Sequence, residues 1–319
     1  LLHVVTKKGK GYKPAEDDPT RFHGTRPFDP SNGELRASSD GPTYSDVFGR
    51  ALLELAEQDC RIVAVSAAMI EGTGLACFQR AFPTRCFDVG MAEEVAVVFA
   101  AGLAAAGLRP VVAIYSTFLQ RAYDQIIHDV ALQNLPVVFA LDRAGLVGDD
   151  GPTHHGVFDL SYLRHVPGMV CMAPRNEGEL RRMLATALEV GCPASLRYPR
   201  GQGSGEGLNE PLRALPVGKA EQLTEGTDVV LVAIGSMVDR ALQAAELALG
   251  EGIRAAVVNA RFAKPLDEEL LCGLARQCGG VVTLEENVAA GGFGSGVAES
   301  LAARGLRVPI RILALPNAF

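Results

Sequence analysis

FDVGMAEEVAVVFAAGL, residues 87–103, indicates the fold of this chain, because it joins the end of a strand to a glycine turn and a helix. Two glutamates, Glu93 and Glu94, stand in the first turn of the predicted helix, and no further charge follows before Arg109. A helix without a polar face is expected to be buried between other elements. A carboxylate at the start of such a helix is costly without a partner, so it is either a satisfied helix-start acid or a working acid.

Strands and helices alternate on both sides of this stretch. The predicted strands occupy residues 61–67, 86–90, 110–116, 136–142, 169–174 and 193–199, and then 228–236, 254–260, 280–286 and 307–315. The predicted helices occupy residues 43–58, the stretch after Glu93, residues 119–133, a segment capped by Asn176, and residues 237–249, 267–277 and 294–304. Apolar strands separated by helices are typical of parallel sheets covered on both faces.

The sequence therefore predicts an α/β protein with two open, mostly parallel-sheet α/β domains, over residues 43–203 and 214–319. A glycine-rich stretch, 201–215, is typical of a linker between them. Residues 1–42 differ, since a short apolar strand (3–6) precedes a basic run and a segment rich in Pro, Gly, Asp and Ser. This composition predicts the tail of a missing N-terminal domain followed by a linker. The basic run 7–13 could hold an anion, although a solvated turn is the simpler interpretation.

Composition excludes several functional classes. The net charge of -7 argues against a general nucleic-acid binder, and no apolar run reaches the ~18 residues of a membrane span. The seven cysteines are scattered without a C-x-x-C pair, which favours a reducing compartment over a disulfide framework or a zinc site. We therefore expect a cytoplasmic protein with neither a nucleic-acid nor a membrane partner.

Polar residues gather where the predicted strands end. In open parallel sheets, ligands bind at the carboxyl ends of the strands, so the loops there should form one rim. These loops are residues 66–71, 90–94, 115–121, 142–155 and 197–200. Arg143 and Arg200 are there either as surface arginines or as a clamp for a phosphate or carboxylate. Histidine can carry protons near neutral pH, but the adjacent His154 and His155 should point in opposite directions, so no metal site is predicted.

Five segments of the chain carry a family resemblance: residues 87–94, 113–125, 142–145, 151–154 and 197–201. They resemble the 1-deoxy-D-xylulose-5-phosphate synthases, a family of transketolase-like thiamine diphosphate enzymes. The resemblance runs from TKKGKGY, residues 6–12, to the end of the chain. The run YSTFLQRAYDQ, residues 115–125, separates this family from other transketolase-like enzymes.

The resemblance implies a thiamine-diphosphate-dependent transferase. Such an enzyme joins pyruvate to D-glyceraldehyde 3-phosphate with loss of CO2, and its product feeds isoprenoid and thiamine synthesis. It further implies a pyrimidine-binding domain followed by a transketolase C-terminal domain, and a homodimer. The Mg2+ and diphosphate ligands are expected in the missing N-terminal domain, because Gly148-Asp149-Asp150 with Asn176 matches the family's Gly-Asp-Gly…Asn motif only in part. The chain is thus expected to be inactive without that domain.

The resemblance also assigns cofactor contacts. Glu93 matches the glutamate that bonds N1′ of the aminopyrimidine, whereas Glu94 receives no role. Phe118 resembles the aromatic residue that stacks on the pyrimidine, and Met91 takes the place of the side chain that holds the cofactor bent. Tyr12 matches a tyrosine that contacts the cofactor.

The same resemblance assigns substrate contacts and catalytic groups. Arg143 and Arg200 resemble the clamp on the phosphate of the aldehyde, and Tyr115 and Arg121 lie beside it in the sequence pattern. The polar groups that would handle the intermediate and the acceptor are Asp150, His154 and, from the linker, His23.

Two alternatives stay open on the sequence. The β-subunit of a 2-oxo acid dehydrogenase shares both domains but lacks the 115–125 run. A regulatory or scaffold fragment without catalysis is the other alternative, since half of the cofactor site would lie outside this chain. A partner that bears the Gly-Asp-Gly…Asn motif would distinguish these alternatives from the synthase.

Overall fold

The computed structural model describes residues 1–23, 27–34 and 41–318. Residues 1–41 form one compact unit and residues 42–319 form a second. The first unit contains the short helix α1 (Lys13–Asp17) and an aromatic cluster of Tyr12, Phe22 and Phe28, whose ring centroids lie 5.3 to 5.7 Å apart. Residues 1–7 have no regular structure, so the strand predicted over residues 3–6 is wrong. A strand needs a neighbour for its backbone hydrogen bonds, and none of the described residues provides one.

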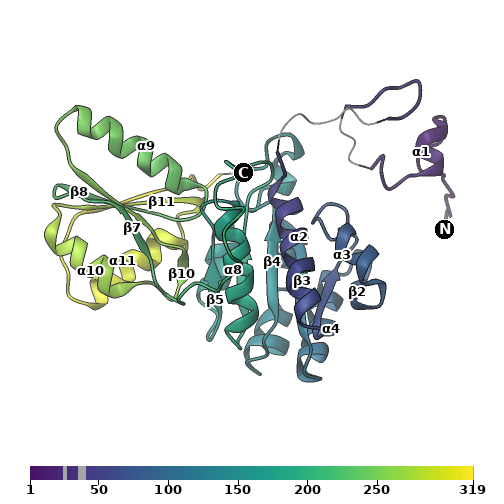
Figure 1. The fold of residues 1–319 in the computed structure, drawn as a ribbon, viewed down its shortest axis with the longest axis horizontal. Helices are drawn as coiled ribbons and strands as arrows, with labels where there is room; N and C mark the ends of the chain where they lie inside the picture. Colours follow the sequence, from purple (N-terminus) through teal and green to yellow (C-terminus); the bar gives the residue numbers. More distant parts are fainter. Residues whose placement is uncertain (24–26, 35–40, 319) are drawn as a thin grey trace. The chain divides into compact units, whose positions relative to one another are not determined.

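The first sheet of the larger unit has seven strands in the order β10-β5-β6-β4-β3-β1-β2 (Figure 1). Its strands are β1 (Ile62–Ser66), β2 (Cys86–Asp88), β3 (Arg109–Tyr115), β4 (Val138–Asp142), β5 (Val170–Met172), β6 (Ala194–Arg197) and β10 (Phe262–Lys264). All neighbours pair in parallel except β10, which runs antiparallel to β5. The parallel strands agree with the sequence prediction, whereas β10 was not predicted.

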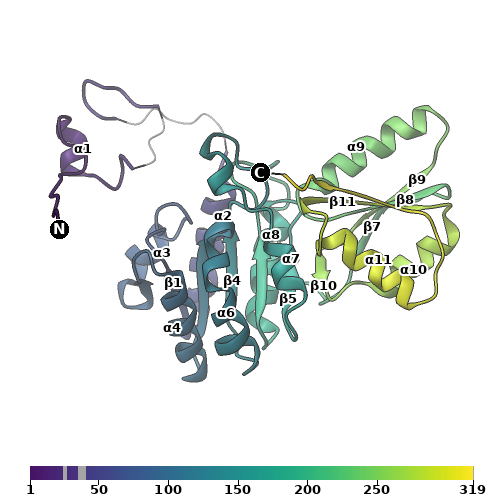
Figure 2. The same cartoon turned by 180° about the vertical axis from the view of Figure 1, so that it is seen from behind.

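Helices cover both faces of this sheet. They are α2 (Tyr44–Gln58), α3 (Ala76–Ala81), α4 (Glu93–Ala105), α5 (Ser116–Leu119), α6 (Tyr123–Gln125), α7 (Asp159–Arg164) and α8 (Glu177–Glu189), with the short turns η1 (Pro83–Arg85), η2 (Gln120–Ala122), η4 (Gly148–Asp150) and η5 (Pro152–His154) and the π-helical segment η3 (Ile126–Ala131). One face is covered by α2 and α8, and the other by α4, α6 and α7 (Figures 1 and 2). The predicted caps are present: Thr43 accepts a hydrogen bond from the Asp46 N–H, and Asn176 accepts one from the Glu179 N–H.

The second sheet has five strands in the order β12-β11-β8-β9-β7. They are β7 (Glu221–Thr224), β8 (Val229–Ala233), β9 (Ala255–Asn259), β11 (Val281–Val288) and β12 (Ile310–Leu315), and the helices are α9 (Met237–Gly250), α10 (Glu268–Gln277) and α11 (Phe293–Ala303). Helix α9 lies on one face, and α10 and α11 lie on the other (Figure 1). The strands pair in parallel except β7, which pairs antiparallel with β9 and was not predicted. This C-terminal domain supplies β10 to the first sheet, so the two domains share a core.

Two helix predictions need correction. Helix α4 is not buried all round: Ala96, Val97 and Ala100 pack into the core, but Val95 and Val98 on the other side are 54% and 48% exposed. An apolar sequence predicts a covered surface but not whether the same chain covers it. The predicted helix 119–133 is instead a broken series of short segments, from α5 to η3.

Candidate functional site

The carboxyl ends of the parallel strands lie at one edge of the first sheet. Tyr115 at the end of β3 is paired in register with Asp142 at the end of β4, and Ser66 with Asp88 on β1 and β2. The loops that follow these strands contact one another through the side chains described below. The rim expected from the sequence is therefore formed in the folded chain.

Arg143 is the centre of the rim. It follows β4 in a left-handed backbone conformation with a φ of 58°, which turns the chain sharply as the strand ends. Its Nη1 donates to the carbonyl of Gly72, 2.8 Å away in the loop after β1, and its guanidinium lies 3.8 Å from the centroid of the Tyr115 ring. Its buried Nε has no hydrogen-bond partner among the described residues. This donor faces the Asp150 carboxylate at 3.6 Å, too far for a hydrogen bond, so a ligand oxygen could still accept from it.

Asp142, the residue before Arg143, is a buried acid that the sequence analysis did not single out. It accepts a hydrogen bond from Ser45 Oγ at 2.6 Å and another from Arg143 Nη1 at 3.3 Å. Burial raises the pKa of Asp142 to about 6, although both partners oppose that rise. Its position at the end of an apolar strand is the sequence feature that could have indicated a buried acid at the rim.

Arg200 and Arg143 meet at a single carboxylate. Oδ2 of Asp150 lies 2.9 Å from Nη1 of Arg200 and 3.6 Å from Nε of Arg143. The structure thus brings together the two arginines predicted as an anion clamp, and it places a negative charge between them. Arg143 is the more enclosed, with a side chain 16% exposed against 40% for Arg200.

Aromatic rings line the next part of the rim. Tyr115 and Phe118 stack at 5.7 Å between centroids, and the His154 ring meets Phe118 edge-on at 5.3 Å. Thr117 Oγ1 donates to the carbonyl of Thr153, which ties the segment after β3 to the loop that carries His154. Burial raises the pKa of Tyr115 and keeps its hydroxyl protonated at neutral pH, although Arg143 acts in the opposite direction.

Glu93 and Glu94 have different surroundings. Glu93, at the start of α4, is 2% exposed, and its Oε2 lies 3.3 Å from Nη1 of Arg121. Its Oε1 accepts no hydrogen bond from the described residues, whereas Glu94 is exposed. Arg121 therefore stands beside Glu93 rather than with Arg143 and Arg200. Met91, also predicted for the cofactor, is 85% exposed in this chain.

Tyr12 and His23 belong to the first compact unit. The hydroxyl of Tyr12 is buried without a hydrogen-bond partner among the described residues, and His23 Nδ1 lies 2.7 Å from Nζ of Lys8. The roles that the sequence predicted for Tyr12 and His23 stay predictions.

The residues present fit part of a thiamine diphosphate site. A buried carboxylate with a free oxygen at Glu93, an aromatic ring at Phe118 and an exposed apolar side chain at Met91 match the needs of an aminopyrimidine: an acceptor, a stacking face and an apolar support. Among the described residues, no three His, Cys, Asp or Glu side chains form a metal-binding group.

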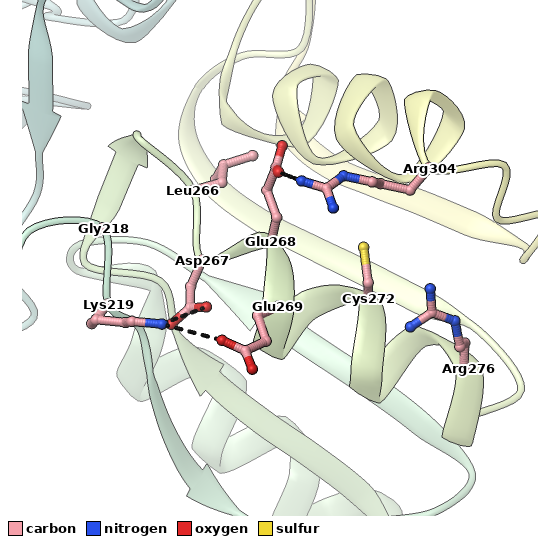
Figure 3. A pocket seen from close by; sticks show the side chains of 9 residues that line it. All are labelled: Gly218, Lys219, Leu266, Asp267, Glu268, Glu269, Cys272, Arg276 and Arg304. Carbon is pink, nitrogen blue, oxygen red and sulfur yellow. Dashed lines mark hydrogen bonds and ion pairs between the residues drawn. The ribbon is translucent and has the colours of Figure 1, made fainter.

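A separate cavity of about 430 Å3 lies on the C-terminal domain (Figure 3). It is lined by Gly218, Lys219, Leu266, Asp267, Glu268, Glu269, Cys272, Arg276 and Arg304. Lys219 lies 3.7 Å from Asp267 and 3.6 Å from Glu269, and Arg304 pairs with Glu268. Lys219 and Arg304 already face carboxylates, and we assign no binding role to the cavity.

The fold and the rim define a chain built of two α/β domains with its polar groups at the strand ends of the first. Two known domain families match these parts: the transketolase pyrimidine-binding domain over residues 40–204, and the transketolase C-terminal domain over residues 218–318. The chain therefore belongs to the transketolase family.

Proteins named 1-deoxy-D-xylulose-5-phosphate synthase are similar to the whole chain. The protein from Desulforudis audaxviator (strain MP104C) is 59% identical and that from Heliobacterium modesticaldum (strain ATCC 51547 / Ice1) 57% identical, each over 100% of this chain. The chain spans about half the length of these relatives, 50% and 49%. A solved structure described as a split gene transketolase, inactive beta4 tetramer, is 33% identical with a TM-score of 0.79, and the match covers 88% of this chain and 91% of that one.

In the described part of the chain, no helix is both long and apolar enough to cross a membrane.

Proposed function

We propose that this chain is the pyrimidine-binding half of a thiamine-diphosphate-dependent transferase that joins pyruvate to D-glyceraldehyde 3-phosphate. The reaction releases CO2 and gives 1-deoxy-D-xylulose 5-phosphate, a precursor for isoprenoid and thiamine synthesis in the cytoplasm. Relatives of that name at 57% to 59% identity support the proposal. The observation that carries it is one shared sheet edge, which holds both the buried Glu93 carboxylate and the pair of Arg143 and Arg200.

Glu93 would hold the cofactor's aminopyrimidine through its free oxygen. When bound, thiamine diphosphate supplies the carbon nucleophile that attacks the ketone of pyruvate and stabilises the charge left when CO2 departs. Burial makes a hydrogen bond between N1′ and Glu93 stronger than the same bond in water. Arg121, whose Nη1 lies 3.3 Å from Oε2 of Glu93, would hold this carboxylate in place and leave Oε1 for the cofactor.

Arg143 and Arg200 would bind the phosphate of the aldehyde. Two guanidinium groups that converge on one carboxylate oxygen can converge equally on a phosphate oxygen. Asp150 and His154 lie on the same loop, where they can exchange a proton with the carbonyl oxygen of the acceptor. Tyr115 supports this arrangement through its contact with Arg143.

The rest of the site is proposed to come from other polypeptide surfaces. A domain of the kind found in the other half of the relatives would hold the diphosphate and its Mg2+. The roles of Tyr12 and His23 remain those predicted from the sequence. A second copy of this chain would cover the exposed apolar face of α4, which includes Val95 and Val98. Each Å2 of apolar surface buried there would contribute about 25 cal/mol of free energy to that association.

The function can be tested by reconstitution. The chain is mixed with the remaining half of the Desulforudis audaxviator relative, thiamine diphosphate, Mg2+, carboxyl-labelled pyruvate and D-glyceraldehyde 3-phosphate. We expect labelled CO2 and 1-deoxy-D-xylulose 5-phosphate, and neither product with the Glu93→Gln chain. Complex formation without CO2 release contradicts the proposal, and transfer of an acetyl group to lipoamide would assign the chain to a 2-oxo acid dehydrogenase instead.

A further inference from the structure

Residues 143–156, here called the 143–156 loop, carry Arg143, Asp150 and His154. The loop closes on itself, because Gly145 N donates to Gly156 O at 2.7 Å and Gly156 N donates to Gly145 O at 2.9 Å. The direction in which the side chains of the loop point therefore depends on the contacts that hold the paired Gly145 and Gly156 in place.

Glu286 of the C-terminal domain reaches the start of the loop from β11. Its Oε1 accepts a hydrogen bond from the backbone N–H of Leu146 at 3.1 Å, and its Oε2 accepts one from Ser236 Oγ at 3.0 Å. A Cβ atom at Gly145 would lie 2.4 Å from the Glu286 carboxylate, and the φ of 81° at Gly145 also favours glycine. The carboxylate thus occupies the space that the glycine leaves open.

The backbone of Glu286 is connected to the other end of the loop. Nη2 of the buried Arg197 donates both to the carbonyl of Glu286 and to the carbonyl of Gly156, each at 3.1 Å. Asp159 holds this arginine in turn, with Oδ2 2.9 Å from its Nε. One residue of the C-terminal domain is therefore tied to both ends of the loop.

We propose that Glu286 is a positioning residue through which the C-terminal domain orients Arg143 and Asp150. It acts on the arginine pair through the backbone at Leu146, three residues after Arg143. The identity of the substrate rests on the proposed function, whereas the contacts between Glu286 and the 143–156 loop do not depend on it.

Three variants separate this role from a general effect on folding. Glu286→Ala removes both acceptors and leaves the Leu146 N–H without a partner. Glu286→Gln keeps the shape and one acceptor for Leu146, and its amide can donate to Ser236 Oγ, so it should restore function. Glu285→Gln is the matched control, because Glu285 faces α11 and accepts from the N–H groups of Phe293 and Gly294 instead.

The experiment combines kinetics with amide hydrogen exchange. In the reconstituted complex, Glu286→Ala should raise the KM for D-glyceraldehyde 3-phosphate by about ten-fold while the KM for pyruvate stays within about two-fold. In this chain alone, without the other half of the enzyme, Glu286→Ala should speed hydrogen exchange of the Leu146 amide. Glu286→Gln and Glu285→Gln should exchange this amide at close to the wild-type rate. Unchanged exchange at Leu146 overturns the inference whether or not the complex turns over pyruvate. Equal losses for both substrates together with a lower Tm also overturn it, because they indicate general destabilisation.

Discussion

Arg200 and Asp150 form an ion pair, with Nη1 of the arginine 2.9 Å from Oδ2 of the aspartate. The same oxygen lies 3.6 Å from Nε of Arg143. A carboxylate therefore stands where two arginines converge. An incoming phosphate must share these arginines with Asp150 or displace it. The pair is partly exposed, so its contribution to stability is small and its main effect is on anion binding.

Replacing Asp150 tests that competition. Asp150→Asn removes the negative charge between the arginines while it keeps the shape of the side chain. We expect inorganic phosphate to bind several-fold more tightly, because the arginines lose their internal partner. We also expect slower turnover, since Asp150 is proposed to act on the acceptor. Calorimetric titration of phosphate measures the first effect, and weaker phosphate binding by the variant would contradict it.

Removing either arginine should affect one substrate selectively. A charge-assisted hydrogen bond contributes about 1.5–3 kcal/mol, so Arg143→Ala and Arg200→Ala should raise the KM for D-glyceraldehyde 3-phosphate about ten- to hundred-fold. Arg143→Ala should have the larger effect because this arginine is more enclosed and contacts both Gly72 and Tyr115. The KM for pyruvate is the internal control. An unchanged KM for the aldehyde would exclude the clamp.

The two neighbouring glutamates form a matched pair of variants. Glu93→Gln should lower kcat by at least about 100-fold in the reconstituted enzyme, which is the usual scale of a lost acid–base group. Glu94→Gln should stay within about two-fold, because that side chain is exposed. Steady-state CO2 release measures both. The reverse result would place the proton partner of the cofactor at Glu94.

The C-terminal domain should lose stability as the pH rises. Burial raises the pKa of Glu285 from an ordinary value of 4.5 to about 7. The hydrogen bonds that it accepts from two backbone N–H groups, and the nearby Arg197 and Arg164, lower this pKa but do not outweigh burial. The folded chain then binds the proton more tightly than the unfolded chain, so this contribution is present below pH 4.5 and lost as the pH passes about 7. The difference corresponds to roughly 3 kcal/mol of unfolding free energy, at about 1.4 kcal/mol per pH unit.

Urea denaturation between pH 5 and pH 8 measures this dependence. Asp142, with its pKa raised by burial to about 6, should contribute in the same direction. Glu285→Gln cannot titrate, so its unfolding free energy should fall less steeply over this range, whatever its absolute value. An equal slope in the variant and the wild type would contradict the assignment to Glu285.

The apolar face of α4 should control self-association. Val98→Asp places a charge in the middle of that face, and a buried unpaired charge disfavours any interface formed there. We expect the wild-type chain to sediment as a dimer or larger species and the variant to sediment as a monomer. Leu247→Asp on α9 is the control, since that exposed leucine lies on the other domain. A variant that still associates would place the interface elsewhere.

Local patterns in the sequence determined most of the fold. Eleven apolar runs predicted strands, and ten of them are present with their parallel pairing; the run at residues 3–6 is not a strand. Periodicity and capping residues such as Thr43 and Asn176 are read within one turn of a helix, so neighbouring residues were sufficient to predict them. The strand ends also predicted the rim, because a parallel sheet places all its carboxyl ends at one edge.

Tertiary structure decided the features that depend on distant residues. The antiparallel strand β10 pairs with β5 some ninety residues earlier in the chain, and its short sequence gives no sign of that partner. Helix α4 is apolar on all sides after its first turn, yet the chain covers only one side of it, because burial depends on what packs against a surface and not on its composition. Asp150 between two arginines and Glu286 beneath Leu146 are likewise contacts across loops and domains. The sequence alone therefore determined the elements and the edge where the polar residues gather, whereas the folded chain decided which of these residues face each other, since side-chain contacts follow from packing over the whole molecule.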